Sequence, residues 1–191
     1  DIAIRQDIEN SDFGAMAERL YHYCAQELSS FYFDIRKDRL YCDRPDLFER
    51  RACRTVLRQI FDCLVVWLSP ILSFTAEEAW SHDALADTDS VHLKTMSDLP
   101  DTWLDKKLAG EWFGIRKVRS VVLGAIEVER NNKTLGSSLE AHPVITVKDP
   151  NLADLLGRVN MADICITSRC SIENGNAKDT DFTLDNVADV S

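Results

Sequence analysis

The sequence contains little glycine, only seven among 191 residues, and neither a Gly-x-x-x-x-Gly-Lys-Ser/Thr nor a Gly-x-Gly-x-x-Gly motif. Loops that hold nucleotide phosphates need such glycines, because backbone N–H groups must approach the phosphates closely. No apolar run approaches the roughly 18 residues that cross a bilayer. The first residues lack the basic and apolar regions of a signal peptide, and Asp1 is not an initiator methionine. We therefore expect a soluble globular protein that is a fragment or a processed product.

A catalytic constellation is also missing from the sequence. The four histidines are scattered along the chain, so each is predicted to be a surface or capping group. The adjacent Glu77 and Glu78 fall in the first turn of a predicted helix, where acidic side chains interact favourably with the helix dipole. This pair is predicted to be structural, and the chain by itself is predicted to be non-catalytic.

Six cysteines are present, but no two of them form a Cys-x-x-Cys pair. Cys24, Cys53 and Cys63 fall within helical patterns, where cysteine behaves as a small apolar residue. Cys165 and Cys170 give only a weak zinc signal, because no second pair accompanies them. We predict reduced thiols in a cytoplasmic protein, with no disulfides and no bound metal.

The net charge of −10 at first disfavours a nucleic-acid partner. The charge is unevenly distributed, however. Residues 34–58 contain eight Lys or Arg against five Asp or Glu, and residues 105–133 contain seven against four. Such charge runs occur on RNA-binding surfaces, but they also occur on ordinary solvated helix faces. Charge alone therefore leaves both interpretations open.

Helical spacing dominates the first two-thirds of the chain. Apolar residues recur at intervals of three and four over residues 13–35, 53–68 and 104–130, which predicts three long amphipathic helices. Asp46 and Thr75 are each followed three residues later by glutamate, the spacing of a capping box, which predicts helix starts at both positions. Residues 91–93 are predicted to be extended.

The last third of the chain has mixed character. Residues 144–147 and 164–167 are predicted strands, residues 151–157 a short helix, and residues 182–184 a last strand. The predicted fold class is mainly α, a helical bundle followed by a small α+β subdomain. We place the bundle at residues 1–132 and the α+β appendage at residues 133–191.

Three segments stand out. They read YCAQELSSFYFDIRKDRLY at residues 23–41, LSPILSFTAEEAW at 68–80 with SVHL at 90–93, and KTLGSSLEA at 133–141. In sequence, order and spacing they resemble the C-terminal anticodon-binding region of the isoleucine–tRNA ligases, a family of class I aminoacyl-tRNA synthetases. The second segment is similar to the valine and leucine enzymes as well, whereas the first and third resemble the isoleucine enzymes specifically.

The resemblance implies a helical bundle that recognises a tRNA anticodon, within a parent ligase that attaches isoleucine to its tRNA using ATP and Mg. The His-x-Gly-His and Lys-Met-Ser-Lys-Ser signatures of that family's catalytic domain are missing here, as is the cysteine-rich zinc module that ends many bacterial members. The resemblance also implies a cytoplasmic monomer that acts in protein biosynthesis. Its expected partners are the anticodon stem-loop of isoleucine tRNA and the rest of the synthetase, without a membrane.

Basic residues in and near the first segment are the candidate tRNA contacts. Lys and Arg hold phosphates, while aromatic rings and guanidinium planes stack on the bases of single-stranded loops. For each basic residue the alternative is a surface salt bridge to a nearby carboxylate, which contributes little. Trp112 is expected in the core rather than on a base. The predicted tRNA-binding residues are Arg36, Lys37, Arg39, Arg50, Arg51, Arg54 and Arg58, with Arg116, Lys117 and Arg119 as a second group.

The alternative function is a helical protein-interaction module with no RNA role. Arg50, Arg54 and Arg58 lie four residues apart and would form one row on a helix, which could equally pair with an acidic protein surface. RNA affinity that falls steeply with salt and depends on the anticodon separates the two hypotheses.

Overall fold

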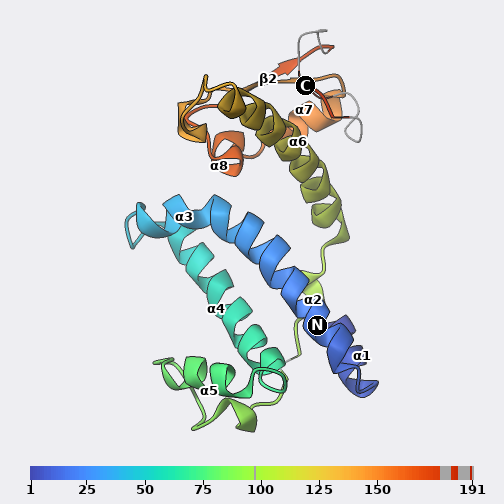
Figure 1. The fold of residues 1–191 in the computed structure, drawn as a ribbon, viewed down its shortest axis with the longest axis vertical. Helices are drawn as coiled ribbons and strands as arrows, with labels where there is room; N and C mark the ends of the chain where they lie inside the picture. Colours follow the sequence, from blue (N-terminus) through green and yellow to red (C-terminus); the bar gives the residue numbers. More distant parts are fainter. Residues whose placement is uncertain (97, 177–181, 185–189, 191) are drawn as a thin grey trace. The chain divides into compact units, whose positions relative to one another are not determined.

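The structure is a computed structural model of the chain and describes residues 1–96, 98–176, 182–184 and 190. The chain forms two compact units, Asp1–Trp103 and Leu104–Ser191. Helices dominate both units, and the second also contains a short sheet (Figure 1), so the predicted mainly α fold class is confirmed. The boundary predicted after residue 132 falls at the end of a long helix of the second unit, and it stays a prediction. None of the helices in the described residues is long and apolar enough to cross a bilayer.

The first unit begins with α1 (Ile2–Glu9), which the sequence analysis did not predict, and continues with α2 (Phe13–His22). A π-helical stretch (Tyr23–Phe33) then joins α2 to α3 (Asp34–Tyr41) without a break, and the three appear as one long rod in Figure 1. In a π-helix the backbone hydrogen bonds span five residues, so the α-helical spacing of side chains shifts. Leu20, Leu28 and Ile35 of this rod are buried, whereas Phe13, at the start of α2, is 47% exposed.

Helix α4 (Phe48–Leu68) turns back from the end of α3, and α5 (Ser73–Ser81) follows it. Both predicted capping boxes are wrong. Asp46 lies outside α4, where it accepts a hydrogen bond from Arg44 Nη2 at 3.0 Å. Thr75 lies inside α5, which begins at Ser73 with Leu72 in the N-cap position.

The predicted extended piece at residues 91–93 is also wrong, because Val91–Leu93 forms a 3-10 helix. A Glu77 carboxylate oxygen accepts hydrogen bonds from the backbone N–H of Val91 at 3.0 Å and from Ser90 Oγ at 2.8 Å. These bonds hold the segment against α5. Glu77 is therefore structural, but it lies beyond the first turn of α5, where the sequence analysis had placed it.

Two apolar clusters hold the C-terminal end of α4. In one cluster Val65 and Val66 pack with Ala76, Trp80 and Val91. In the other, Trp67 of α4 packs with apolar side chains of α1 and α2, namely Ile4, Met16 and Leu20. Both clusters lie near one end of the helix, so the N-terminal half of α4 is left to carry the arginines.

An ion pair ties the loop after α5 to the middle of α4. Arg58 Nη1 lies 2.7 Å from both carboxylate oxygens of Asp83, and Arg58 Nε donates to Asp62 at 3.0 Å. Asp83 also accepts a hydrogen bond from the backbone N–H of Leu85 at 3.1 Å. The hydrogen bond from Arg58 lowers the pKa of the Asp83 carboxyl below its usual value.

The second unit contains α6 (Lys106–Asn131), a 3-10 helix (Ser138–Glu140), β1 (Val144–Val147), α7 (Pro150–Gly157), α8 (Met161–Cys165) and β2 (Ser171–Asn174). The two strands are parallel, with Val144 opposite Ser171. Strand β1, α6 and α7 were predicted. The strand predicted at residues 164–167 is wrong: its first residues belong to α8, which Asn160 caps through the backbone N–H of Asp163. A short apolar run does not distinguish a buried strand from a buried helical turn.

The core of the second unit gathers around β1 and the middle of α6. Ile145 and Val147 of β1 are buried against a stripe of α6 and against Leu156 of α7. Burial in this core raises the pKa of the Cys165 thiol to about 12. Trp112 packs against the same core, as predicted. Within the described residues, 182–184 form no continuous strand, and Phe182 and Leu184 instead contact this core.

We predict that Ile145→Ala destabilises the second unit by about 2–5 kcal/mol, because it leaves a cavity in a packed core. Ile145 is 1% exposed, whereas its neighbour Val144 is 50% exposed. Urea denaturation followed by Trp112 fluorescence, with the other three tryptophans replaced by phenylalanine, measures this unit. The control Val144→Ala should cost well under half as much. Equal losses for both variants would contradict the assigned orientation of β1.

We predict that Asp83→Asn lowers the melting temperature at neutral pH. Because the Asp83 pKa is lower in the folded state than in the unfolded state, the ion pair stabilises the fold above the unfolded pKa of about 4. That stabilisation is lost as the pH falls through the folded-state pKa, so the difference between wild type and variant should vanish in acid. Melting curves from pH 7 downward, at roughly unit intervals, test this. The control is Asp89→Asn, which replaces an exposed carboxylate that makes no ion pair in the described part of the chain. A pH-independent loss in Asp83→Asn would contradict this role of the ion pair.

Candidate nucleic-acid interface

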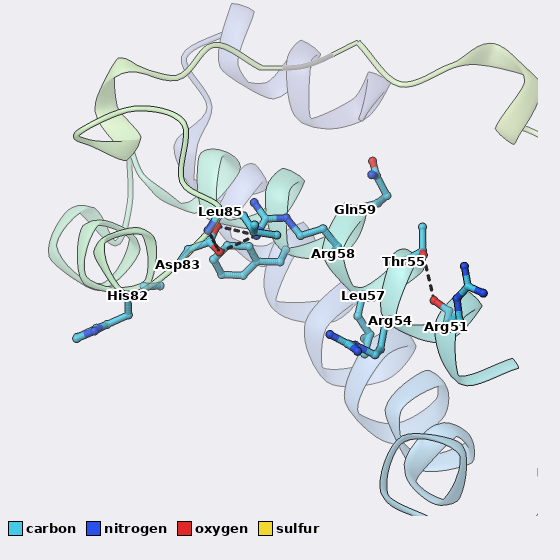
Figure 2. Close-up of a pocket in the computed structure, with 11 residues that line it drawn as sticks. Arg51, Arg54, Thr55, Leu57, Arg58, Gln59, His82, Asp83 and Leu85 are labelled. Carbon is cyan, nitrogen blue, oxygen red and sulfur yellow. Dashed lines mark hydrogen bonds and ion pairs between the residues drawn. The ribbon is translucent and has the colours of Figure 1, made fainter. Parts of the chain in front are cut away.

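The N-terminal half of α4 borders an open hollow of about 770 Å³. Residues 51, 54, 55 and 58 of α4 follow the spacing i, i+3, i+4 and i+7, so helical geometry brings them to one face. Figure 2 shows Arg51, Arg54 and Arg58 along this helix, with Asp83 and Leu85 approaching from the loop after α5. The residues that line the hollow are Arg51, Arg54, Thr55, Leu57, Arg58, Gln59, Phe61, Ala79, His82, Asp83 and Leu85.

Arg51 and Arg54 are the two open cations of this hollow. Both are exposed, and neither side chain makes an ion pair or hydrogen bond within the described part of the chain. Thr55 Oγ1 donates a hydrogen bond to the backbone carbonyl of Arg51 at 3.0 Å. This bond does not involve the guanidinium group of Arg51. These two side chains can therefore bind an anion without first breaking a salt bridge.

In the predicted row of Arg50, Arg54 and Arg58, the side chains of Arg50 and Arg58 make contacts that stabilise the fold. Arg58 is held by Asp62 and Asp83, so the salt-bridge alternative describes it best. Arg50 Nη1 donates to the backbone carbonyl of Asp43 and anchors the loop between α3 and α4. The row at positions 50, 54 and 58 thus forms as helical spacing predicted, but only Arg54 remains open within it.

The basic residues of α3 lie in the same unit and are mostly engaged. Lys37 Nζ lies 2.8 Å from Asp34, and this hydrogen bond raises the Lys37 pKa. Arg39 Nη1 lies 3.3 Å from Asp43. Arg36 is half-buried near Tyr32; burial raises the pKa of the Tyr32 phenol to about 12, an effect that the positive charge of Arg36 partly opposes.

The second predicted group lies on α6, in the other compact unit. Arg119 Nε donates to the carbonyl of Ile164 at 2.8 Å, which fastens α8 to α6. Lys117 Nζ lies 4.6 Å from the centre of the Phe113 ring, a cation–π contact. Arg116 is half-buried. Arg119 and Lys117 therefore stabilise local structure within the second unit.

An apolar slot of about 400 Å³ on the neighbouring side of α4 was missed by the sequence analysis. Its walls include the rings of Tyr23, Trp67 and Trp103, together with aliphatic side chains of α4. Thr55 and Gln59 line both the slot and the arginine-lined hollow. The position of Gln59 on α4 follows from the sequence, but the approach of Trp103 is a long-range contact that no local pattern reveals.

A metal site has no support in the described residues, because they contain no group of three or more His, Cys, Asp or Glu side chains placed to hold an ion. All six cysteines, each of which lies in the described part of the chain, are free thiols. The four histidines are exposed, and His142 Nε2 is 2.9 Å from Ser171 Oγ.

Comparison with known proteins agrees with this geometry. A family model described as the anticodon-binding domain of tRNA ligase matches residues 2–145. Proteins named isoleucine–tRNA ligase are similar over the full chain: 46% identical over 191 residues in Mesorhizobium japonicum, 45% over 190 in Agrobacterium fabrum and 43% over 190 in Bartonella henselae. The chain covers 19–20% of those proteins, so it spans about a fifth of their length. Because the family model covers most of the chain, including all of α4, this chain belongs to the family of anticodon-binding domains of tRNA ligases.

Proposed function

We propose that this chain is the anticodon-recognition part of an isoleucine–tRNA ligase and that α4 faces the anticodon loop of isoleucine tRNA. The observation that carries the proposal is the pair of exposed, unengaged arginines on α4, inside the region that matches the family model. The choice of isoleucine is supported by the names of the relatives that match the whole chain.

In this proposal Arg51 and Arg54 bind phosphates of the loop, because guanidinium groups match phosphate geometry and need no rearrangement here. The other predicted contacts are candidates of lower rank, because the fold already uses many of their charges. Those candidates are Arg36, Lys37, Arg39, Arg50, Arg58, Arg116, Lys117 and Arg119. The net charge of −10 would limit binding to other RNA.

The proposal assigns no chemistry to this chain. The parent ligase would activate isoleucine with ATP and Mg in domains that these residues do not include, and any zinc would belong to a module outside them. The partners are isoleucine tRNA and the remaining synthetase chain, and we expect a monomer in the cytoplasm, where the free thiols would stay reduced.

We predict that the chain binds an isoleucine tRNA transcript more tightly than the same transcript with a changed anticodon. Arg51→Ala/Arg54→Ala should weaken binding and reduce the slope of log affinity against log salt by about 1.4, because each phosphate contact to a single strand contributes about 0.7. Titrations at several salt concentrations measure both effects, and circular dichroism verifies that the variant is folded.

The matched control is Arg158→Ala/Arg169→Ala, which removes two exposed charges from the second unit. This control should keep the wild-type affinity and salt slope. A folded Arg51→Ala/Arg54→Ala variant with the wild-type slope would contradict the role of α4. Equal binding of both transcripts by the wild type would contradict anticodon recognition by this chain and favour the protein-interaction alternative.

A further inference from the structure

The apolar slot beside the arginines has no role in phosphate binding. We propose that it holds one unpaired base of the anticodon loop, with Trp103 stacking on the base and Gln59 reading its edge. This inference rests on the proposed function and adds to it a base-binding subsite on named residues.

The walls of the slot suit a flat heterocycle. Its volume of about 400 Å³ lies within the usual range for ligand pockets. Trp67 is only 9% exposed and is fixed in the core, whereas Trp103 is 58% exposed and presents its ring to an incoming group. Stacking on aromatic rings is the general means by which proteins bind splayed-out bases of single-stranded RNA.

The charge next to the slot favours a nucleotide over an uncharged apolar ligand. Thr55 and Gln59 line the slot and also the hollow that contains Arg51 and Arg54. A nucleotide whose base enters the slot would therefore have its phosphates on the side where the two open guanidinium groups lie. An aliphatic ligand or apolar side chain would leave those charges without a partner.

Gln59 is placed to distinguish one base from another. It is exposed, and no hydrogen bond of its side chain occurs in the described part of the chain. Its amide offers two donor hydrogens and one acceptor oxygen, which match the donor and acceptor pattern of a base edge. Gln59 also lines a third, more polar hollow together with Asp62 and Lys94. It therefore borders the slot and both hollows.

The test uses isoleucine tRNA transcripts that carry an abasic nucleotide at each anticodon-loop position in turn. For the wild-type chain, one abasic position should weaken binding by about tenfold, the loss expected for one stacked base. Trp103→Ala should weaken binding of the intact transcript by a similar factor, and the same abasic position should then cause no further loss. Gln59→Ala should reduce discrimination among the four bases at that position alone.

The controls are Phe74→Ala and Gln6→Ala, which truncate an exposed aromatic and an exposed amide away from the slot. Both should bind as wild type, and melting curves establish that every variant is folded. If Trp103→Ala keeps wild-type affinity, or if its loss adds to every abasic loss, the slot does not hold a base. If the wild type still depends on the anticodon in that case, the proposed function stands, and the slot is better explained as a binding surface for another protein. Absence of anticodon dependence in the wild type would overturn the proposed function and this inference together.

Discussion

The burial of the C-terminal end of α4 is the constraint on which the rest of the first unit depends. Val65 and Val66 face one apolar cluster, while Trp67 faces another that includes Met16 and Leu20. Packing on both sides fixes the direction of the helix axis, since burial of several large side chains contributes far more than any surface ion pair. The N-terminal half of α4 is therefore held firmly, although few of its own residues are buried. In the proposed function, RNA would meet arginines on a helix that packing at its other end already positions.

The basic residues divide into those that stabilise the fold and those that remain open for a ligand. Arg58 fastens the loop after α5, Arg50 fastens the loop before α4, and Arg119 fastens α8. Arg51 and Arg54 are exposed on α4 without such partners in the described chain. In an acidic protein this division matters, because many positive charges already lie beside carboxylates, as Arg19, Lys37 and Arg58 do. In the proposed function, an RNA would meet only a small number of unpaired arginines in the described chain. This favours binding of one specific loop over nonspecific binding along an RNA phosphate backbone.

Much of the fold and part of the site could be predicted from the sequence. The apolar periodicity of α4 and α6 is long and regular, so both helices were predicted with nearly correct ends. The π-helical stretch was missed because its hydrogen bonds depart from the α-helical period. The strand predicted at 164–167 failed because a short apolar run fits either structure. On the site, helical spacing predicted a row of Arg50, Arg54 and Arg58 on α4, and Arg54 is the member of that row that lines the hollow without an ion pair in the described chain. The pairing of Arg58 with Asp83 and the approach of Trp103 to α4 are long-range contacts that only the folded chain shows.

The central claim is that the α4 face beside Trp103, rather than another part of the chain, meets the anticodon loop. An NMR titration of the isotope-labelled chain with an anticodon stem-loop tests it most directly, because tryptophan indole and arginine side-chain N–H signals report on single residues. We predict that the signals of Trp103, Arg51 and Arg54 shift, while those of Trp80, a buried residue of α5, and Arg158 stay in place. Shifts confined to the second unit, with the α4 signals unchanged, would contradict it.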